Sequence, residues 1–233
     1  NYAHWLFDVV PKLIITSKLY NLSKIDFFYF SKLNSFQKET LKIMKINPKK
    51  FIDSNEYRHI EAEKLIAVTH PNYFKKTFFF AHSNLPYWII YSLKKVFLKK
   101  KLKKNSYKKI FIDRSDSTQN HCKLVNNYEV KNFLKKNGFK ILQLSKFKLI
   151  DQISIFRNCR EIISPHGAGL ANLTFCKSRT KVTEIIPRSI KNIEYRRISK
   201  INNLKHKFIR LKNIKKNTSG DMYLNLEYLK KLL

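Results

Sequence analysis

Residues 162–173 read Ile-Ile-Ser-Pro-His-Gly-Ala-Gly-Leu-Ala-Asn-Leu, and this stretch decides the fold expected for the second half of the chain. The whole chain has only four glycines, and Gly167 and Gly169 stand one residue apart here. An apolar run at residues 161–164 leads in, and small and apolar residues at 168–175 lead out. This pattern predicts a strand, a tight turn and a helix.

Such a turn has two interpretations. The first N–H groups of a helix have no partners within it, and the helix end carries roughly half a positive charge. Glycines at that point let a phosphate approach closely. Alternatively, the turn is an ordinary connection in which glycine only permits the backbone angles. These residues alone leave both interpretations open.

The composition indicates a folded chain with a sizeable core, in one large domain or two smaller ones, because 43% of its 233 residues are hydrophobic. Lysine interrupts every apolar run before it reaches the roughly 18–20 residues that span a bilayer. The three cysteines form no CxxC pair and predict free thiols in a reducing compartment; they are Cys122, Cys159 and Cys176.

Charge is the strongest compositional signal, since 48 Lys and Arg against 16 Asp and Glu leave a net charge of +32. Such an excess favours an acidic partner: nucleic acid, an anionic membrane face or a phosphate-bearing substrate. The alternative is coding bias, because an AT-rich gene would also use Lys, Asn and Ile heavily, and the lysines are spread along the whole chain.

Apolar runs that predict strands alternate with stretches of helical spacing. In the first half the expected strands are residues 25–30, 51–52 and 65–68, the expected helices are 35–46 and 86–98, and an aromatic run of either type spans 77–82. In the second half the expected strands are 109–113, 139–144, 161–164, 180–186 and 208–211, and the expected helices are 126–137, 149–159, 168–175, 190–202 and 221–233. This alternation predicts an α/β fold with a parallel, doubly wound sheet, where ligands bind beyond the carboxyl ends of the strands.

A dense basic segment divides the chain, with nine lysines among residues 94–109. It is typical of a linker or a solvated helix end, with membrane or polyanion contact as the alternative. We predict an N-terminal α/β domain over residues 1–100, a C-terminal α/β domain over 101–215 and a helical tail over 216–233. Because the chain starts at Asn1 rather than at Met, and no signal-peptide pattern follows, we expect it to be a fragment that has lost an N-terminal part, which leaves the first domain incomplete.

The N-terminal segment carries a histidine and an aspartate four residues apart. His4 and Asp8 would share one face of a helix, and Pro11 predicts that one helix ends at Val10 and another begins at Pro11. This pair is a candidate for chemistry, with a structural role as the alternative. The remaining scattered histidines lack metal-ligand spacing and are interpreted as structural or surface residues; they are His59, His70 and His82.

Three kinds of site use a glycine-rich turn like this one. A dinucleotide fingerprint is disfavoured, because Asn172 stands where its third small residue should be. The oxyanion loop of lipase-like hydrolases requires a GxSxG motif, which four glycines at 138, 167, 169 and 220 cannot supply. A diphosphate site is the interpretation that remains. The chain offers no DxD motif to bring a metal to such a site, since Asp113 and Asp116 are three residues apart and Asp221 stands alone.

Energetics indicate what a diphosphate site needs besides the turn. A helix end contributes about 0.3–1 kcal/mol, and a hydrogen bond to a charged group contributes about 1.5–3 kcal/mol. A modest 10⁶-fold acceleration requires roughly 8 kcal/mol. Fixed cations must therefore assist, and Arg114, at the end of the strand 109–113, is the first candidate, with His166 as a further donor.

Four segments in order carry a family resemblance. Residues 1–11, Asn-Tyr-Ala-His-Trp-Leu-Phe-Asp-Val-Val-Pro, are followed by Ile-Phe-Ile-Asp-Arg at 110–114, by Pro-His-Gly-Ala-Gly-Leu-Ala-Asn-Leu-Thr-Phe at 165–175 and by Val-Thr-Glu-Ile-Ile-Pro at 182–187. Their order and spacing resemble glycosyltransferase family 61 across essentially the whole chain. This family includes plant β-1,2-xylosyltransferase, animal O-linked N-acetylglucosaminyltransferases and bacterial polysaccharide-biosynthesis proteins.

The resemblance implies a GT-B architecture of two Rossmann-like domains, with the nucleotide-sugar, UDP-linked in our expectation, held mainly by the C-terminal one. It implies an inverting transfer of a hexosyl or pentosyl group without a metal or other cofactor. The residues that would hold the donor diphosphate are Arg114, His166, Gly167, Ala168 and Gly169. Glu184 would lie near the nucleoside, with a buried strand position as the alternative.

On the acceptor side, the resemblance implies that His4 and Asp8 face the cleft. An inverting transfer needs a base to take the proton of the acceptor hydroxyl, and we expect His4, oriented by Asp8, to be that base. The residues expected to line the acceptor cleft are Asn1, Lys123, Asn126 and Asn172. Two departures from the family pattern concern the donor: Asp113 replaces a serine before Arg114, and only Lys123 and Asn126 remain of a basic pair followed by Asn-Glu.

We expect the acceptor to be a glycan or lipid-linked glycan of capsule or lipopolysaccharide assembly. The expected location is the cytoplasm, with peripheral contact to the anionic inner membrane face. The alternatives are a basic nucleic-acid-binding α/β protein and a catalytically degenerate family member. Nucleic acid is the less favoured partner, because the aromatics lie mostly in apolar runs that are typical of core rather than on a basic surface.

Overall fold

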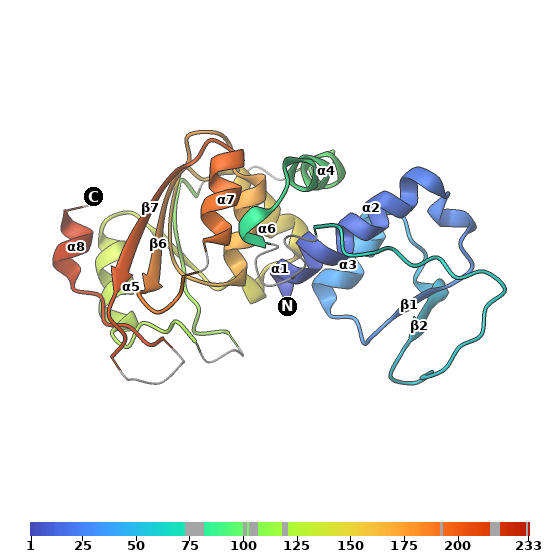
Figure 1. The fold of residues 1–233 in the computed structure, drawn as a ribbon. Helices are drawn as coiled ribbons and strands as arrows, with labels where there is room; N and C mark the ends of the chain where they lie inside the picture. The colour runs from blue at the N-terminus through green and yellow to red at the C-terminus, as the bar shows by residue number, and fades with distance from the viewer. Residues whose placement is uncertain are drawn as a thin grey trace. The chain divides into compact units, whose positions relative to one another are not determined.

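The computed structural model describes residues 1–72, 82–99, 102, 107–117, 121–191, 193–214, 220–231 and 233. It divides into two compact units, Asn1–Lys101 and Leu102–Leu233 (Figure 1). Most of the aromatic run 77–82 and part of the lysine-dense segment 94–109 lie outside the described residues. Among the described residues, no helix has both the length and the apolar character needed to cross a membrane.

The second unit contains a five-stranded sheet in which every strand pairing is parallel. Its strands are β3 (Lys109–Ile112), β4 (Lys140–Leu142), β5 (Glu161–Pro165), β6 (Lys181–Pro187) and β7 (Lys205–Leu211). The spatial order is β4-β3-β5-β6-β7. The chain runs from β3 outward to β4 and then returns across β3 to β5, so the strand order reverses between β3 and β5. The predicted α/β class with parallel sheets is confirmed.

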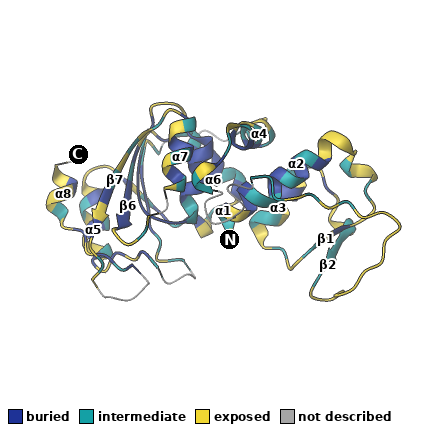
Figure 2. Ribbon diagram, in the orientation of Figure 1, coloured by how far each residue is buried: buried dark blue, intermediate teal, exposed yellow. Residues whose placement is uncertain are grey.

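Helices cover both faces of this sheet. The helices are α5 (Asn127–Lys136), α6 (Leu149–Asn158), α7 (Glu194–Ile201) and α8 (Leu226–Lys230), with the short 3₁₀ helix η5 (Leu144–Lys146). Figure 1 shows α5 and α8 on one face and α6 and α7 on the other. The α5 and α8 face holds a buried cluster made of Phe111, Val130, Leu134, Ile163, Ile185, Ile209, Met222, Leu224, Leu229 and their neighbours. Because both faces are covered, the three central strands β3, β5 and β6 are mostly buried and apolar, and their buried residues are dark blue in Figure 2. The edge strands β4 and β7 carry more exposed residues.

Three of the expected elements differ in type, length or existence, two of them in the second unit and one in the first. Residues 168–175 form a 3₁₀ helix, η6 (Ala168–Phe175), instead of an α-helix. The terminal helix is only the short α8, because residues just before it form bridges in which Met222 pairs with Leu124 and Asn213. In the first unit, residues 65–68 form no strand.

The first unit opens on a continuous helical segment. It consists of α1 (Tyr2–His4), the π-helical turn η1 (Trp5–Val9) and α2 (Val10–Leu19). Pro11 lies in the first turn of α2, as predicted, but the expected break before it is a π-turn, in which the Val10 N–H donates to the Trp5 carbonyl. Pro11 has no N–H to donate to the preceding turn, which a widened turn tolerates.

The rest of the first unit packs around this segment. The helices α3 (Ser35–Ile43) and α4 (Tyr87–Phe97) accompany the strands β1 (Phe28–Phe30) and β2 (Phe51–Asp53), which pair in parallel, and the 3₁₀ turns η2 (Leu22–Lys24), η3 (Pro48–Lys50) and η4 (His82–Asn84). The buried Trp5 indole donates to the Thr40 hydroxyl at 3.1 Å, which ties the first helix to α3.

The C-terminal tail is held by one buried amide. Asn126 donates to the Leu224 carbonyl at 2.9 Å, and its own carbonyl accepts from the Leu224 N–H at 3.1 Å. Asn126 and Leu224 are both buried, so no water can replace these bonds.

We predict that Asn126→Ala lowers the free energy of unfolding by about 2–3 kcal/mol, because it leaves a buried donor and a buried acceptor unpaired. Urea denaturation of the two proteins measures this difference. Asn137→Ala is the matched control, because the Asn137 amide makes its bond to the Phe133 carbonyl at an exposed position. Equal losses of stability in the two variants would contradict the role given to the buried hydrogen bonds between Asn126 and Leu224.

Candidate functional site

Parallel pairing of β3 with β5 brings two predicted residues together at the carboxyl ends of these strands. Phe111 lies opposite Ile163, so Arg114 and the turn after Pro165 leave the sheet side by side. The Arg114 guanidinium donates to the His166 carbonyl. It also donates to the His121 carbonyl at 3.3 Å and to the Ser117 hydroxyl at 3.4 Å. The guanidinium is thus fixed at the point where the strand order reverses.

Gly167 is required by the close approach of Arg114. A Cβ atom on Gly167 would lie 2.5 Å from both Cζ and Nε of Arg114. The backbone of Gly167 is extended, with φ of 162° and ψ of 170°, which any residue can adopt. Gly169 is similarly confined, since its Cβ would lie 2.7 Å from a methyl group of Leu144. Both glycines are thus marked by close side-chain contacts rather than by left-handed backbone angles, and the contact at Gly167 is the more confined one because hydrogen bonds hold the Arg114 guanidinium in place.

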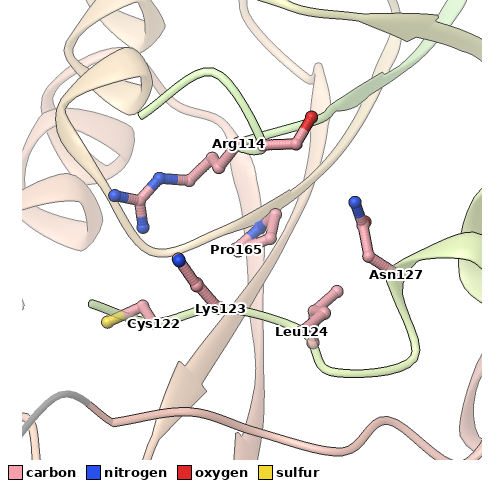
Figure 3. A pocket seen from close by; sticks show the side chains of 7 residues that line it. Arg114, Cys122, Lys123, Leu124, Asn127 and Pro165 are labelled. Atoms are coloured by element: carbon pink, nitrogen blue, oxygen red, sulfur yellow. The ribbon is translucent and has the colours of Figure 1, made fainter. Parts of the chain in front are cut away.

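A pocket opens beside this arginine. It is lined by Arg114, Ser115, Cys122, Lys123, Leu124, Asn127 and Pro165. Figure 3 shows Lys123 directed toward Arg114 and Pro165. Lys123, expected on the acceptor side, thus lines the same pocket as Arg114, and two cationic side chains face one cavity. The sequence analysis did not assign Ser115, Asn127 or Pro165 to the site, although Pro165 opens the segment 165–175 that carries the family resemblance.

Asp113 anchors the end of β3 from within the protein. Its carboxylate accepts from Asn127 at 2.9 Å, from the Ser115 N–H at 3.1 Å and from Lys131 at 3.1 Å. Burial alone would raise the pKa of Asp113, but the hydrogen bonds from Asn127, Ser115 and Lys131 outweigh it and hold the pKa below its ordinary value. The aspartate that replaces the family's serine therefore joins β3 to α5.

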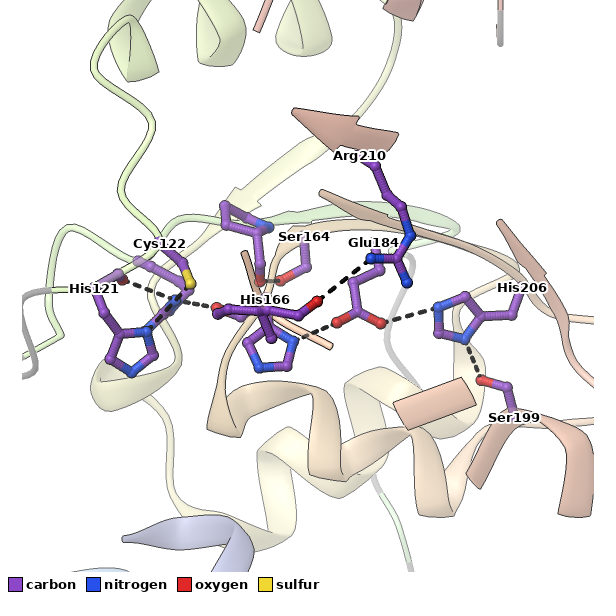
Figure 4. A network of polar contacts seen from close by, with 11 residues as sticks. His121, Cys122, Ser164, His166, Glu184, Ser199, His206 and Arg210 are labelled. Carbon is purple, nitrogen blue, oxygen red and sulfur yellow. Dashed lines mark hydrogen bonds and ion pairs between the residues drawn. The ribbon is translucent and has the colours of Figure 1, made fainter. Parts of the chain in front are cut away.

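Behind the turn, a buried carboxylate lies between two histidines. Glu184 contacts His166 Nδ1 at 2.5 Å and His206 Nε2 at 3.0 Å, and His206 Nδ1 lies 2.7 Å from the Ser199 hydroxyl. Figure 4 shows this row. Burial alone would raise the pKa of Glu184, but hydrogen bonds from His166 and His206 outweigh it and lower the pKa. Glu184 therefore fixes the ring of His166 beside Arg114 and Gly167.

Three other predicted site residues use their side-chain amides to form hydrogen bonds with backbone groups of the protein itself. The amide of Asn126 binds Leu224, as described above, and Asn172, fully buried, donates to Gln152 at 3.1 Å and to the Gly169 carbonyl at 3.2 Å. In the first unit, the Asn1 side chain caps α1 by accepting from the Ala3 N–H at 3.0 Å. Ala168 is the first residue of η6, directly after its N-cap Gly167, and Gly169 is the second.

The first unit has its own cluster of polar groups around Asp8. His4 Nδ1 lies 2.7 Å from Asp8 Oδ2, as the helical spacing predicts. His82 Nε2 and His70 Nε2 lie 2.8 Å and 3.3 Å from Asp8 Oδ1. Burial alone would raise the pKa of Asp8, but hydrogen bonds from His4 and His82 outweigh it and hold the pKa well below its ordinary range.

The histidines at 70 and 82 were interpreted as structural or surface residues, and their contact with Asp8 was missed. No local spacing signals a contact between segments so far apart in sequence. Within the described part of the chain, His4, Asp8 and His82 are also the group whose ligand atoms, all within 4.8 Å of one another, could approach a metal ion. Their separations are those of hydrogen bonds.

The lowered pKa of Glu184 predicts a pH-dependent contribution to stability. A carboxyl group whose pKa is depressed on folding stabilises the protein above its unfolded value, near 4.5, and loses this effect as the pH falls through the folded value. Glu184→Gln should therefore cost about 3–5 kcal/mol at pH 7, and the difference from wild type should shrink steadily below about pH 4.5.

Urea denaturation at several pH values measures this. Glu227→Gln is the matched control, because Glu227 is exposed and forms an exposed ion pair with Lys230; it should stay within about 0.5 kcal/mol of wild type. A Glu184→Gln difference that does not change with pH would contradict the account.

The family model described as Glycosyltransferase 61 matches residues 2–183, which include the Asp8 cluster, Arg114 and the glycine turn. No curated protein matches the chain at a significant level. The match covers well over half of the chain. The protein therefore belongs to glycosyltransferase family 61, and it is a glycosyltransferase that uses a nucleotide-sugar donor and a glycan acceptor.

Proposed function

We propose that this enzyme is an inverting glycosyltransferase of GT-B architecture that transfers its sugar without a metal ion. Its donor diphosphate would occupy the pocket beside Arg114, against the turn that contains Gly167 and Gly169. The observation that carries this proposal is the packing of the Arg114 guanidinium on Gly167 at the reversal of strand order. Open parallel sheets bind their ligands at this position.

Fixed cations support a transfer without a metal. The leaving nucleoside diphosphate gains negative charge as the bond to the sugar breaks, and Arg114 and Lys123 line the pocket. His166 accepts from the Arg114 guanidinium at its backbone carbonyl, and its ring has Nδ1 on Glu184, so Nε2 would be the nitrogen offered to the diphosphate. Each hydrogen bond to a charged group contributes about 1.5–3 kcal/mol. Three such groups approach the roughly 8 kcal/mol that a 10⁶-fold acceleration needs.

The proton of the acceptor hydroxyl requires a base. We assign this role to His4, because Nδ1 of His4 faces Asp8 and its side chain is 62% exposed. In the transfer, the hydroxyl proton passes to His4, the hydroxyl oxygen bonds to the anomeric carbon, and the electron pair of the breaking bond leaves with the diphosphate. General bases of this kind contribute about 10²–10⁴-fold in rate.

The setting proposed for this reaction is capsule or lipopolysaccharide assembly on the cytoplasmic side of the membrane. A UDP-linked hexose or pentose would be the donor, and a glycan or lipid-linked glycan the acceptor. The net charge of +32 favours attraction to an anionic membrane surface and to polyanionic glycans.

We predict that Arg114→Ala weakens UDP binding by about 10–100-fold, because it removes charged hydrogen bonds worth about 1.5–3 kcal/mol. Gly167→Ala should weaken it as well, since the added methyl displaces the guanidinium. Calorimetry in EDTA, followed by a hydrolysis panel of UDP- and GDP-sugars, measures both effects.

Arg160→Ala is the matched control, because Arg160 is an exposed arginine at the opposite, amino end of β5. It should bind UDP like wild type. A wild-type protein without nucleotide binding or turnover would contradict the proposal, and tight, salt-dependent oligonucleotide binding in its place would indicate a nucleic-acid-binding protein. UDP binding without turnover of any donor would indicate a degenerate member.

A further inference from the structure

Asp8 is surrounded by three imidazoles that come from three separate segments of the first unit. Its Oδ2 faces His4 Nδ1 at 2.7 Å. Its Oδ1 faces His82 Nε2 at 2.8 Å and His70 Nε2 at 3.3 Å. The Asp8 and His70 side chains are each 17% exposed and that of His82 is 12% exposed, so only His4, at 62%, reaches far into solvent.

The geometry is that of hydrogen bonds rather than of a metal centre. Zinc binds nitrogen and oxygen at roughly 2.0–2.2 Å in a tetrahedral arrangement, which separates ligand atoms by about 3.3 Å. The contacts of 2.7 Å and 2.8 Å are shorter than this, and they use different oxygens of the carboxylate. Both distances match charge-assisted N–H···O bonds.

The protons in this cluster can be placed. The hydrogen bonds of His4 and His82 keep Asp8 ionised, so its oxygens act only as acceptors. Each ring nitrogen bonded to Asp8 must therefore carry a proton. His70 supplies an independent check, because its Nδ1 accepts from the Asn72 N–H at 3.2 Å and its Nε2 then carries the proton toward Asp8.

This arrangement has a consequence for His4. With its proton on Nδ1, the neutral ring of His4 keeps its lone pair on Nε2, on the side away from Asp8. The His82 ring packs against His4 at 4.8 Å between centroids, and Phe7 packs its ring edge-on to His82 at 5.6 Å. The rings are therefore restrained by packing as well as by hydrogen bonds.

We propose that His70 and His82 are positioning residues that hold Asp8, and through it fix His4 in the tautomer that accepts the proton of the acceptor hydroxyl at Nε2. This rests on the proposed function, in which His4 is the base. When Nε2 takes the proton, the imidazolium forms against a carboxylate that is already ionised and held in place. The surrounding donors then need no rearrangement in the transition state.

Histidine-selective ¹⁵N NMR on the whole chain tests the network without donor or acceptor, since ring nitrogen shifts report which nitrogen carries the proton. His4 should be mainly the Nδ1–H tautomer in the wild type. Asp8→Asn should shift it to the Nε2–H tautomer, because the amide oxygen is needed by the Nε2–H groups of His70 and His82 on the Oδ1 side. The amide NH₂ then faces His4 and donates to its Nδ1. His82→Leu and His70→Leu should shift it in part.

His82→Gln should restore the wild-type tautomer, because the glutamine amide can donate from the position of Nε2. Where transfer is measured, His82→Leu should lower kcat with little change in the donor KM, and His82→Gln should recover it. His59→Leu, at an exposed histidine outside the cluster, is the matched control and should change neither. Thermal melts confirm that each variant is folded.

A wild-type His4 in the Nε2–H tautomer, or a tautomer unchanged in folded His82→Leu and Asp8→Asn, would overturn the proposal. Stoichiometric Zn²⁺ or Mn²⁺ retained by the wild type and lost in His82→Leu would overturn it in favour of a metal site. The tautomer measurement requires no substrate, so its failure is distinct from that of the proposed function, which fails if no nucleotide binds.

Discussion

The contact between the Arg114 guanidinium and Gly167 is the constraint on which the candidate donor site depends. A side chain at position 167 would occupy the space of the guanidinium itself. The arginine reaches this point because β3 and β5 are parallel neighbours whose carboxyl ends meet. The strand order thus brings Arg114 to position 167, and the glycine at that position leaves room for its guanidinium.

Two buried carboxylates, Asp113 and Glu184, form hydrogen bonds that fix residues around Arg114 and Gly167. Asp113 joins the end of β3 to α5 through Asn127 and Lys131, and Glu184 holds His166 and His206. A buried carboxylate is costly unless its hydrogen bonds are satisfied, and both receive several. Asp113 and Glu184 do not line the pocket themselves. Asp113 instead fixes Asn127, which lines the pocket, and Glu184 fixes His166, which follows the lining residue Pro165. In the first unit, Asp8 is likewise a largely buried carboxylate whose oxygens contact several side chains, those of His4, His70 and His82.

The sequence predicted the second unit well because its physics is local and periodic. Apolar runs separated by helical spacing predict a parallel sheet, and such a sheet places the carboxyl ends of its strands at one edge, so Arg114 and Gly167 were expected at the same edge. Their direct contact depends on β3 and β5 being neighbours, which the order along the chain does not predict. The pairing of His4 with Asp8 followed from helical spacing. The reason for Gly167 did not follow, because the sequence pattern is the same whether a glycine permits a close approach or an unusual backbone angle.

Other features depended on long-range contacts that no spacing reveals. His70 and His82 reach Asp8 from segments far along the chain, and Asn126 meets the tail through Leu224. The strand expected at 65–68 failed because a short apolar run needs a partner strand, which the described residues of the first unit do not supply. The helix expected at 168–175 became 3₁₀, and Asn172 there donates to the Gly169 carbonyl three residues back.

The central claim is that a nucleoside diphosphate binds at the glycine turn. Titration of ¹⁵N-labelled protein with UDP, in EDTA, tests this directly through the backbone amides. The account predicts saturable shifts that are largest at Gly167, Ala168 and Gly169 and much weaker with uridine, which lacks the phosphates. Saturable shifts that leave these three amides unmoved, or equal shifts with uridine, would contradict it.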